Sequence, residues 1–505
     1  MLYSIVHILE MNLCFLLLFL PRKHAENTVI LISLFYCALC MFSISSIRAV
    51  FTLIISFYAE RWKRTYDSLS ANLFVMLCIL YFAPYRLTNI SFQLSFSAGV
   101  ILSISNKSQR QWKGGFVNML RTSVILQTGL LPIQLHSFYT FSPVGIFFNV
   151  LLLSFLELAF IFLIISLLFS FTSLLIGRFF AGLVHYIFLT FQKILKISGK
   201  RKFLSLTLGN PALYMIVIFV ILYSVILYFD KKSKKPYFII LSFIWLVFLP
   251  LYRDTIVVNL SVGQGDCSVI LNKSNVILID CGSNSMENVG EKILLPFLQY
   301  YGYDHIDYVF ISHLDSDHIN GIKKDTGLFS NKTKYFIGEY FCNRDSLSDL
   351  ITDNTQVSYT NGEDSIQIGE VSIQVLNYKE NFQKDDNEHC QLLSAGIKGY
   401  RFLYLGDVSA DILETLDERY IKDCYLVKIP HHGSRSSLSE SFYTLVNPSI
   451  SVVSVGRNNY GHPNKEVLDS LHKVSSRVFV TKEDGAVITS IKRKGIRSWS
   501  FYSSK

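Results

Sequence analysis

The first half of the chain repeats apolar runs with short polar interruptions, and this pattern stops abruptly near Arg253. A bilayer with a hydrocarbon core of about 30 Å needs about 20 mostly apolar residues per crossing helix. The runs therefore predict a multi-pass α-helical membrane domain over residues 1–252, in which shorter runs are broken or re-entrant helices. About ten spans are expected: Leu2–Leu20, Asn27–Ile44, Ile47–Tyr58, Ala71–Tyr85, Phe92–Ser105, Phe116–Leu135, Val144–Leu175, Phe180–Ile197, Leu213–Phe229 and Tyr237–Leu251.

After Arg253, short apolar runs that end at Gly, Asp or His alternate with charged stretches. Strands that end in polar residues are how an α/β sheet presents a site at its edge. Residues 253–505 are therefore predicted to fold as an extramembrane domain of two mixed sheets flanked by helices.

Composition supports this division. Half of the residues are hydrophobic and only 17% are charged, with a mean hydropathy of +0.36, whereas soluble chains carry about 25% charge. The net charge of +9 suits anionic lipid or a polyanionic ligand, and positive-inside loops alone would explain it equally well. We expect no disulfide framework and no cleavable signal peptide.

Basic residues in the short loops predict the orientation. The segments 22–23, 61–64, 107–113 and 231–235 fall on one side of the predicted spans, which the positive-inside rule makes cytoplasmic. The last span then leads to an extracytoplasmic C-terminal domain. A further basic cluster at 193–202 falls outside in this count, so either a span is miscounted or the cluster has an external role.

The stretch "ISHLDSDHING" places His313, Asp315, Asp317 and His318 directly after the predicted strand Tyr308–Ser312. Alternating imidazoles and carboxylates on a loop after a strand converge as metal ligands from a rigid base. The mixed nitrogen and oxygen set suits Zn²⁺ or Mn²⁺, and the carboxylates lean toward Mn²⁺. A charged surface loop is the alternative, but the order of the residues argues against it.

Acidic or imidazole side chains also follow four other predicted strands. Each alone is a weak signal, since a Gly-Asp pair after a strand is often only a turn. Together they are hard to explain by packing, and we expect them to join the same site. These residues are Asp280, Asp407, His431, His432 and His462.

The order of these motifs resembles the metallo-β-lactamase fold, an αββα sandwich. The series "VGQGDCSVIL", "LIDCG", "HLDSDHING", "LGD", "KIPHHGS" and "YGHP" is similar to the C-terminal domain of ComEC-type competence proteins. In the apolar half, "SSIRAVF", "NISFQLSFSAGVIL" and "FSPVGIFFNVLLL" resemble pieces of the family's competence domain. Family members usually begin with spans and an OB-like domain, so this sequence is expected to lack both, as a truncated or split gene would.

The resemblance implies a site for two divalent metal ions, Zn or Mn. His313 and Asp315 would bind the first ion. Asp317 and His318 would bind the second, and Asp407 would bridge the two.

Four further residues complete the implied site. His462 is expected as another ligand, and His431 or His432 as a ligand or as a donor to phosphate. Asp280 would orient a ligand from behind. We expect Asp317, His432 and Asp280 to take part in catalysis.

The family usually supplies a third histidine to the first metal, from a loop before the bridging acid. Here that region has a single histidine, His389, beside Cys390 and before the predicted hairpin Gln391–Gly406. We therefore expect His389 or Cys390 to complete the first site. The alternative is that this loop only shapes the cleft.

The resemblance implies a channel that imports single-stranded DNA during natural transformation, and a nuclease domain that degrades the other strand. The implied partners are DNA, the lipid bilayer, a DNA receptor, a cytoplasmic translocation ATPase and a second copy of the chain. The implied location is the cytoplasmic membrane. Because a polyanion needs a polar path, Arg48, Gln93 and Gln127 are the expected channel residues. For any one of them, hydrogen bonding between helices is the simpler role.

Two other interpretations remain open. The spans could anchor a metallohydrolase that acts on a wall polymer, a phospholipid or a small ester. The chain could also be an inactive remnant without a DNA-receiving domain.

Overall fold

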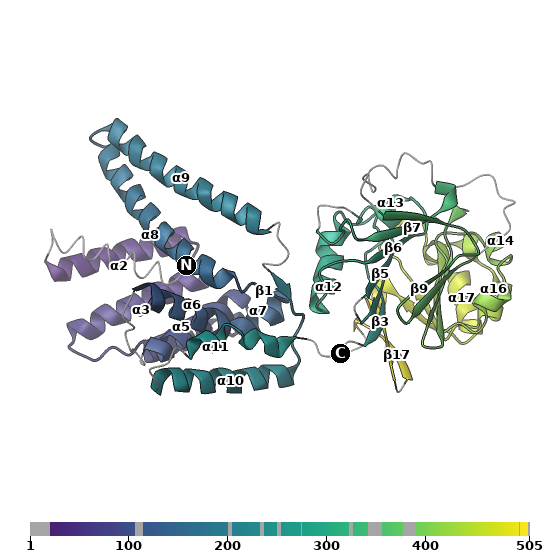
Figure 1. Cartoon of the computed structure of the whole chain (residues 1–505), viewed down its shortest axis with the longest axis horizontal. Coiled ribbons are helices and arrows are strands. Elements are labelled where there is room, and N and C mark those ends of the chain that lie inside the picture. Colours follow the sequence, from purple (N-terminus) through teal and green to yellow (C-terminus); the bar gives the residue numbers. More distant parts are fainter. Residues whose placement is uncertain are drawn as a thin grey trace. The chain divides into compact units, whose positions relative to one another are not determined.

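The computed structural model describes residues 21–106, 115–199, 205–232, 237–249, 254–273, 275–322, 327–341, 356–376, 389–493 and 495–502. The chain forms two compact units, residues 1–249 and 250–505. Helices make up the first unit, coloured purple to teal in Figure 1, and β-sheets form the centre of the second, coloured teal to yellow.

The first unit is helical because its apolar runs are long and contain few helix breakers. Nine of the ten predicted segments fall on helices, and the first, Leu2–Leu20, lies outside the described residues. The helices are α2 (Arg22–Leu39), α3 (Ile44–Arg61), α4 (Ser68–Phe82), α5 (Ile90–Asn106), α6 (Gly115–Gly129), α7 (Leu131–Phe138), α8 (Gly145–Ser170), α9 (Leu174–Gly199), α10 (Leu213–Lys232) and α11 (Phe238–Leu241).

Fewer of these helices reach membrane-spanning length than the sequence predicts. In the described part of the chain, Leu174–Ile194 and Leu213–Asp230 are long and apolar enough, and α6 with α7 forms a third span only if the bent pair counts as one. The predicted span Phe116–Leu135 is broken by a 50° bend. Pro132, near the start of α7, lacks an N–H and collides with the preceding turn, which explains the break.

The surface of the helical unit is suited to lipid. Large apolar side chains point outward, among them Leu175 on α9 and Leu213 on α10, which are 81% and 77% exposed. A soluble protein rarely exposes so extensive an apolar surface. The apolar helices therefore belong in a membrane, as their composition predicts.

The second unit contains two mixed sheets. The larger has the order β17-β16-β3-β4-β5-β6-β7-β8, and the smaller has the order β15-β14-β13-β12-β11-β10-β9. The strands are β3 (Thr255–Asn259), β4 (Cys267–Asn272), β5 (Asn275–Cys281), β6 (Tyr308–Ile311), β7 (Lys334–Gly338), β8 (Gln356–Thr360), β9 (Ser365–Ile368), β10 (Val371–Val375), β11 (Leu393–Ile397), β12 (Tyr400–Tyr404), β13 (Leu426–Lys428), β14 (Ile450–Val453), β15 (Arg477–Val480), β16 (Val487–Lys492) and β17 (Gly495–Ser500).

The two sheets pack face to face, and helices cover their outer faces. Val257 and Phe310 of the larger sheet share a buried core with Phe402 and Val452 of the smaller one. The outer face of the larger sheet packs beneath α12 (Leu295–Tyr300), and that of the smaller sheet beneath α16 (Glu440–Val446) and α17 (Lys465–Lys473). These layers, visible in Figure 1, confirm the predicted αββα sandwich.

The parallel strands β5 to β8 and β12 to β15 end in the loops that carry the predicted site residues. The prediction that Asp280 follows its strand was wrong by a small margin. Asp280 lies inside β5, with a left-handed φ of +53°, where the pairing of β4 with β5 shifts register at Cys267. This irregularity lets a residue within the strand adopt a backbone conformation that is otherwise found in loops.

Candidate metal centre

Two buried histidines of the loop after β6 are oriented by one carboxylate. Ser312 donates its backbone N–H and its hydroxyl to Asp280, at 2.8 and 2.6 Å. Its Oγ lies 2.9 Å from Nδ1 of His313, and Oδ2 of Asp280 lies 3.0 Å from Nδ1 of His318. Each Nδ1 therefore faces an acceptor, which leaves the lone pair of each ring on Nε2.

A third buried histidine arrives from the smaller sheet. Nδ1 of His432 lies 2.9 Å from the carbonyl oxygen of Ser454. His431 and His432 both have left-handed φ values, +47° and +52°, which cost about 1–3 kcal/mol each and are typical of functional turns. Within the described residues, Nε2 of His313, His318 and His432 is buried without a hydrogen-bond partner.

Carboxylates lie between these imidazoles. Asp407, which follows β12, has Oδ1 3.3 Å from Nε2 of His318 and Oδ2 3.7 Å from Nε2 of His432. Asp317 Oδ2 lies 3.3 Å from the same His432 nitrogen. Asp315 Oδ2 lies 3.6 Å from Nε2 of His313. Orphaned imidazole nitrogens facing carboxylate oxygens are a donor set that fits divalent metal ions.

The electrostatics agree with this fit. Burial alone would raise the pKa of Asp407, but the nearby imidazoles of His318 and His432 outweigh it and hold that pKa well below its usual value. Burial likewise lowers the pKa of His318, but Asp407 and Asp280 raise it well above the usual value. Such a cluster attracts positive charge, either as protons or as cations that displace them.

The remaining predicted ligands lie at the margin of this cluster. Nε2 of His431 is 4.0 Å from Oδ2 of Asp407, and its ring centre is 5.8 Å from that of His462. Nδ1 of His462 is buried and has no hydrogen-bond partner in the described part of the chain. The fold thus brings the seven predicted ligands into one neighbourhood. His318 is common to every group of three that could hold an ion among the residues that the structure describes.

His389 and Cys390, one of which is expected to complete the first site, lie beside this cluster. The His389 ring stacks on Tyr340 with centres 3.6 Å apart. Sγ of Cys390 accepts the N–H of Asp407 at 3.4 Å, and burial raises the pKa of its thiol well above the usual value. Neither belongs to the ligand groups found among the described residues. Cys390 thus supports the backbone that carries Asp407.

The sequence interpretation missed a buried ion pair beneath the imidazoles. Nζ of Lys428 donates to Oδ2 of Asp266 at 2.7 Å, and both residues are almost fully buried. The Asp266 carboxylate also lies 3.7 Å from Nδ1 of His432 and 4.0 Å from Nδ1 of His318. A lysine in the buried strand "LVK" was the available signal, because buried lysines are rare without a partner.

Close backbone packing places Asp266 there. A Cβ on Gly265 would lie 2.4 Å from the carbonyl oxygen of Gly282 and 2.7 Å from that of Asp317. A Cβ on Gly282 would lie 2.4 Å from the backbone nitrogen of His318. Only glycine allows these three loops to meet, which explains the glycine at positions 265 and 282.

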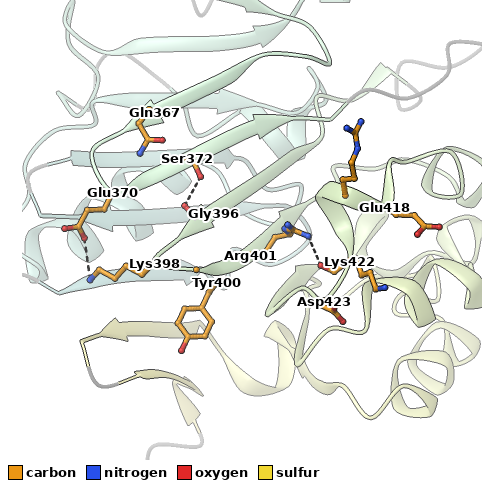
Figure 2. A pocket seen from close by; sticks show the side chains of 12 residues that line it. Gln367, Glu370, Ser372, Gly396, Lys398, Tyr400, Arg401, Glu418, Lys422 and Asp423 are labelled. Atoms are coloured by element: carbon orange, nitrogen blue, oxygen red, sulfur yellow. Dashed lines mark hydrogen bonds and ion pairs between the residues drawn. The ribbon is translucent and has the colours of Figure 1, made fainter.

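A groove of about 770 Å³ lies elsewhere on the smaller sheet, at the turn between β11 and β12 (Figure 2). This turn is at the opposite end of β12 from Asp407. In the groove, Arg401 donates to the carbonyl oxygen of Lys422 at 2.7 Å, and Lys398 lies 3.6 Å from Glu370. None of the residues that line the groove belongs to the candidate ion-binding groups of the described residues, so the groove is separate from the metal centre.

The predicted channel residues lie on three helices. Arg48 of α3 is buried and donates to Ser95 of α5 at 3.0 Å and to Asn72 of α4 at 2.8 Å. Gln93 of α5 donates to the carbonyl oxygen of Leu87 at 3.0 Å. Gln127 of α6 is half-buried. In the described residues, Arg48 thus joins three helices through neutral groups.

Comparison with known proteins matches both units. Residues 2–232 match the competence protein family, and residues 260–340 match the metallo-β-lactamase superfamily. ComE operon protein 3 of Bacillus subtilis is 25% identical over 450 residues, which cover 81% of this chain and 56% of that protein. Recombination protein 2 of Haemophilus influenzae is 25% identical over 513 residues, which cover 91% of this chain and 62% of that protein.

The chain therefore spans about three fifths of the length of these relatives. Among solved structures, the metallo-β-lactamase fold protein YhfI of Bacillus subtilis has a TM-score of 0.34 and 13% identity, and the match covers 46% of this chain and 99% of that protein. The chain thus combines a region that matches the competence protein family, residues 2–232, with a later region that matches the metallo-β-lactamase superfamily, residues 260–340.

Proposed function

We propose that this protein takes part in DNA uptake: the helical unit passes a single strand across the cytoplasmic membrane, and the sandwich unit hydrolyses phosphodiester bonds of the other strand. The observation that carries the hydrolytic half is the convergence of three buried, unpartnered imidazole nitrogens with carboxylates at one sheet edge. The competence-family match supports the uptake half. Importing one strand of a duplex requires disposal of the other, which joins the two activities in one chain.

The proposed centre takes two divalent ions, Mn²⁺ or Zn²⁺, which would supply positive charge to polarise the phosphodiester and activate water. His313, Asp315, Asp317, His318 and Asp407 form the proposed ligand set. The Nδ1 contacts of the imidazoles fix their orientation in advance, and ordered ligands reduce the entropy lost on binding.

The next layer of residues has distinct proposed roles. His432 and His462 extend the ligand set from the smaller sheet. His431 is partly exposed and can donate to a phosphate oxygen. Asp280 orients His318 and, through Ser312, His313. Asp266 places a buried negative charge 3.7 Å from Nδ1 of His432 and 4.0 Å from Nδ1 of His318.

In the helical unit, Arg48, Gln93 and Gln127 are the proposed contacts to the translocated strand. The loop charges support an extracytoplasmic position for the sandwich unit, where the duplex would arrive. Other competence proteins, a receptor and a translocation ATPase, are the proposed partners. Protease added to intact protoplasts should remove the sandwich unit, and full protection would place that unit in the cytoplasm.

The test of hydrolysis uses the full chain purified in nanodiscs and stripped of metal. After Mn²⁺ or Zn²⁺ is restored, we expect cleavage of DNA that Asp407→Asn loses. Asp411→Asn is the matched control, because Asp411 is exposed on α14 (Ala410–Leu413). Metal-dependent hydrolysis of a phospholipid or wall polymer, without cleavage of DNA, would favour a membrane-anchored hydrolase instead.

A further inference from the structure

An exposed aromatic side chain lies at the rim of the candidate metal centre, in the loop after β14. Tyr460 is 73% exposed, and its ring centre lies 6.0 Å from that of His462. The His462 ring lies in turn 5.8 Å from that of His431, which approaches Asp407. Tyr460 therefore offers a free aromatic surface close to the groups that would hold the metal ions.

The loop that carries Tyr460 is held in one conformation by Asn458. The Asn458 amide donates to the carbonyl oxygens of Gly456 and His462, at 3.1 and 2.9 Å. Its oxygen accepts the N–H groups of Tyr460 and His462, at 3.0 and 3.1 Å. A ring presented on a fixed loop loses little freedom when a ligand covers it, which favours binding.

A second aromatic surface approaches the centre from the other sheet. Tyr340 follows β7, the neighbour of β6, and is 48% exposed. Its ring stacks on that of His389, and the two ring planes are nearly parallel, 8° apart. The next residue, Cys390, contacts the backbone N–H of Asp407. One aromatic group from each sheet thus lies near the candidate ligands.

We propose that Tyr460 is a stacking platform for a nucleobase, so that the metal centre receives unpaired nucleotides. This inference rests on the proposed function and names its substrate class. In an intact duplex, each base face is covered by its neighbours. A rim tyrosine can therefore be covered only by a base from a single strand or a frayed end. Stacking tolerates any sequence, because every base has an aromatic face.

The test compares two short ligands, a thymidine tetranucleotide and an abasic tetramer with the same sugar-phosphate backbone. Binding to the full chain in nanodiscs is measured with Ca²⁺. Loss of one stacked base changes affinity roughly 5- to 140-fold. We expect the wild type to prefer the thymidine ligand by a factor in this range, Tyr460→Phe to keep the preference, and Tyr460→Ala to lose most of it.

Tyr502→Ala is the matched control, since Tyr502 is 59% exposed at the end of β17, and it should keep the wild-type preference. Equal preference in wild type and Tyr460→Ala would overturn the proposal, even if the protein cleaves DNA. Loss of preference in Tyr460→Ala alone would support the platform, even if no metal restores cleavage. The binding experiment therefore tests the stacking platform independently of the nuclease activity.

Discussion

The two units bury polar groups in opposite ways. In the helical unit, the buried Arg48 is satisfied by neutral partners, Asn72 and Ser95. In the sandwich, most of the buried side-chain atoms without hydrogen-bond partners lie at the candidate metal centre, and such atoms in the described chain lie in this unit alone. An unpaired polar group in hydrocarbon costs several kcal/mol, so a membrane unit must satisfy its polar groups internally. Unpaired groups gathered at one sheet edge instead indicate a ligand.

The largest effect should come from His318→Ala in the sandwich unit. This change removes the imidazole common to every candidate ion-binding group among the described residues. We expect loss of bound metal and a fall in DNA hydrolysis of more than about 100-fold, beyond the 10- to 100-fold typical when a residue that only orients a ligand is lost. Metal analysis of the purified chain checks this. His472→Ala, at an exposed position of α17, is the control. Wild-type metal content in His318→Ala would contradict the ligand assignment.

Lys428→Met tests whether the buried ion pair supports the centre. The change leaves the Asp266 charge buried without its lysine, which should destabilise the sandwich by about 3–5 kcal/mol. Metal affinity should fall about 10- to 100-fold, because Asp266 contacts two imidazoles. The double variant Lys428→Met with Asp266→Asn should recover stability but not affinity. Thermal unfolding measures the stability, and metal titration measures the affinity. Unchanged values of both in the single variant would contradict the supporting role of the ion pair.

Arg48→Gln tests the hydrogen-bonded cluster that Arg48 forms with Asn72 and Ser95 in the helical unit. A charge at mid-bilayer costs at least about 2.5–3.5 kcal/mol, so it should have a function or a partner. We expect transformation to fall by about tenfold or more, while hydrolysis by the purified chain stays at the wild-type rate. Ser95→Ala, which removes one hydrogen bond but keeps the charge, should have a smaller effect. Normal transformation by Arg48→Gln would reduce Arg48 to a structural link between helices.

The smallest effect is expected at the surface of the sandwich. Hydrogen bonds that the His305 ring donates to Asp304 and Asp307 raise the pKa of His305 to about 9. A raised histidine pKa stabilises the folded state fully below the unfolded pKa of about 6.5, and this stabilisation is lost as pH rises through about 9. Because His305 is nearly half exposed, it should contribute less than about 1 kcal/mol. Chemical denaturation at pH 6 and pH 10 should show that the stability of His305→Gln depends less on pH than that of the wild type. An unchanged pH dependence would exclude a contribution from the contacts of His305 with Asp304 and Asp307.

The sequence predicted the sandwich and the grouping of the site residues well, because both depend on local pattern. Apolar runs identify strands, and polar residues just after parallel strands must meet at one edge. The pairing of Asp266 with Lys428 could not be foreseen in this way, because it joins the two sheets. Asp280 was placed just beyond its strand, since no local signal marks the irregularity that frees it within β5.

Prediction was weaker for the membrane spans. A hydropathy pattern identifies an apolar run but does not reveal a bend within it. The run Phe116–Leu135 is mostly apolar, yet Pro132 divides it into α6 and α7. The stacking of His389 on Tyr340 was hidden for a related reason, since the two residues are close only after β7 and the hairpin are in place.

The pairing of β3 with β16 has a consequence for synthesis on the ribosome. The first strand of the sandwich completes its hydrogen bonds only with a strand near the C-terminus, and His462 of the candidate centre is translated late. A nascent or prematurely terminated chain therefore lacks both a closed larger sheet and a full ligand set. The proposed hydrolytic activity can therefore arise only after translation of the protein is nearly finished, and incomplete chains left in the membrane would lack it.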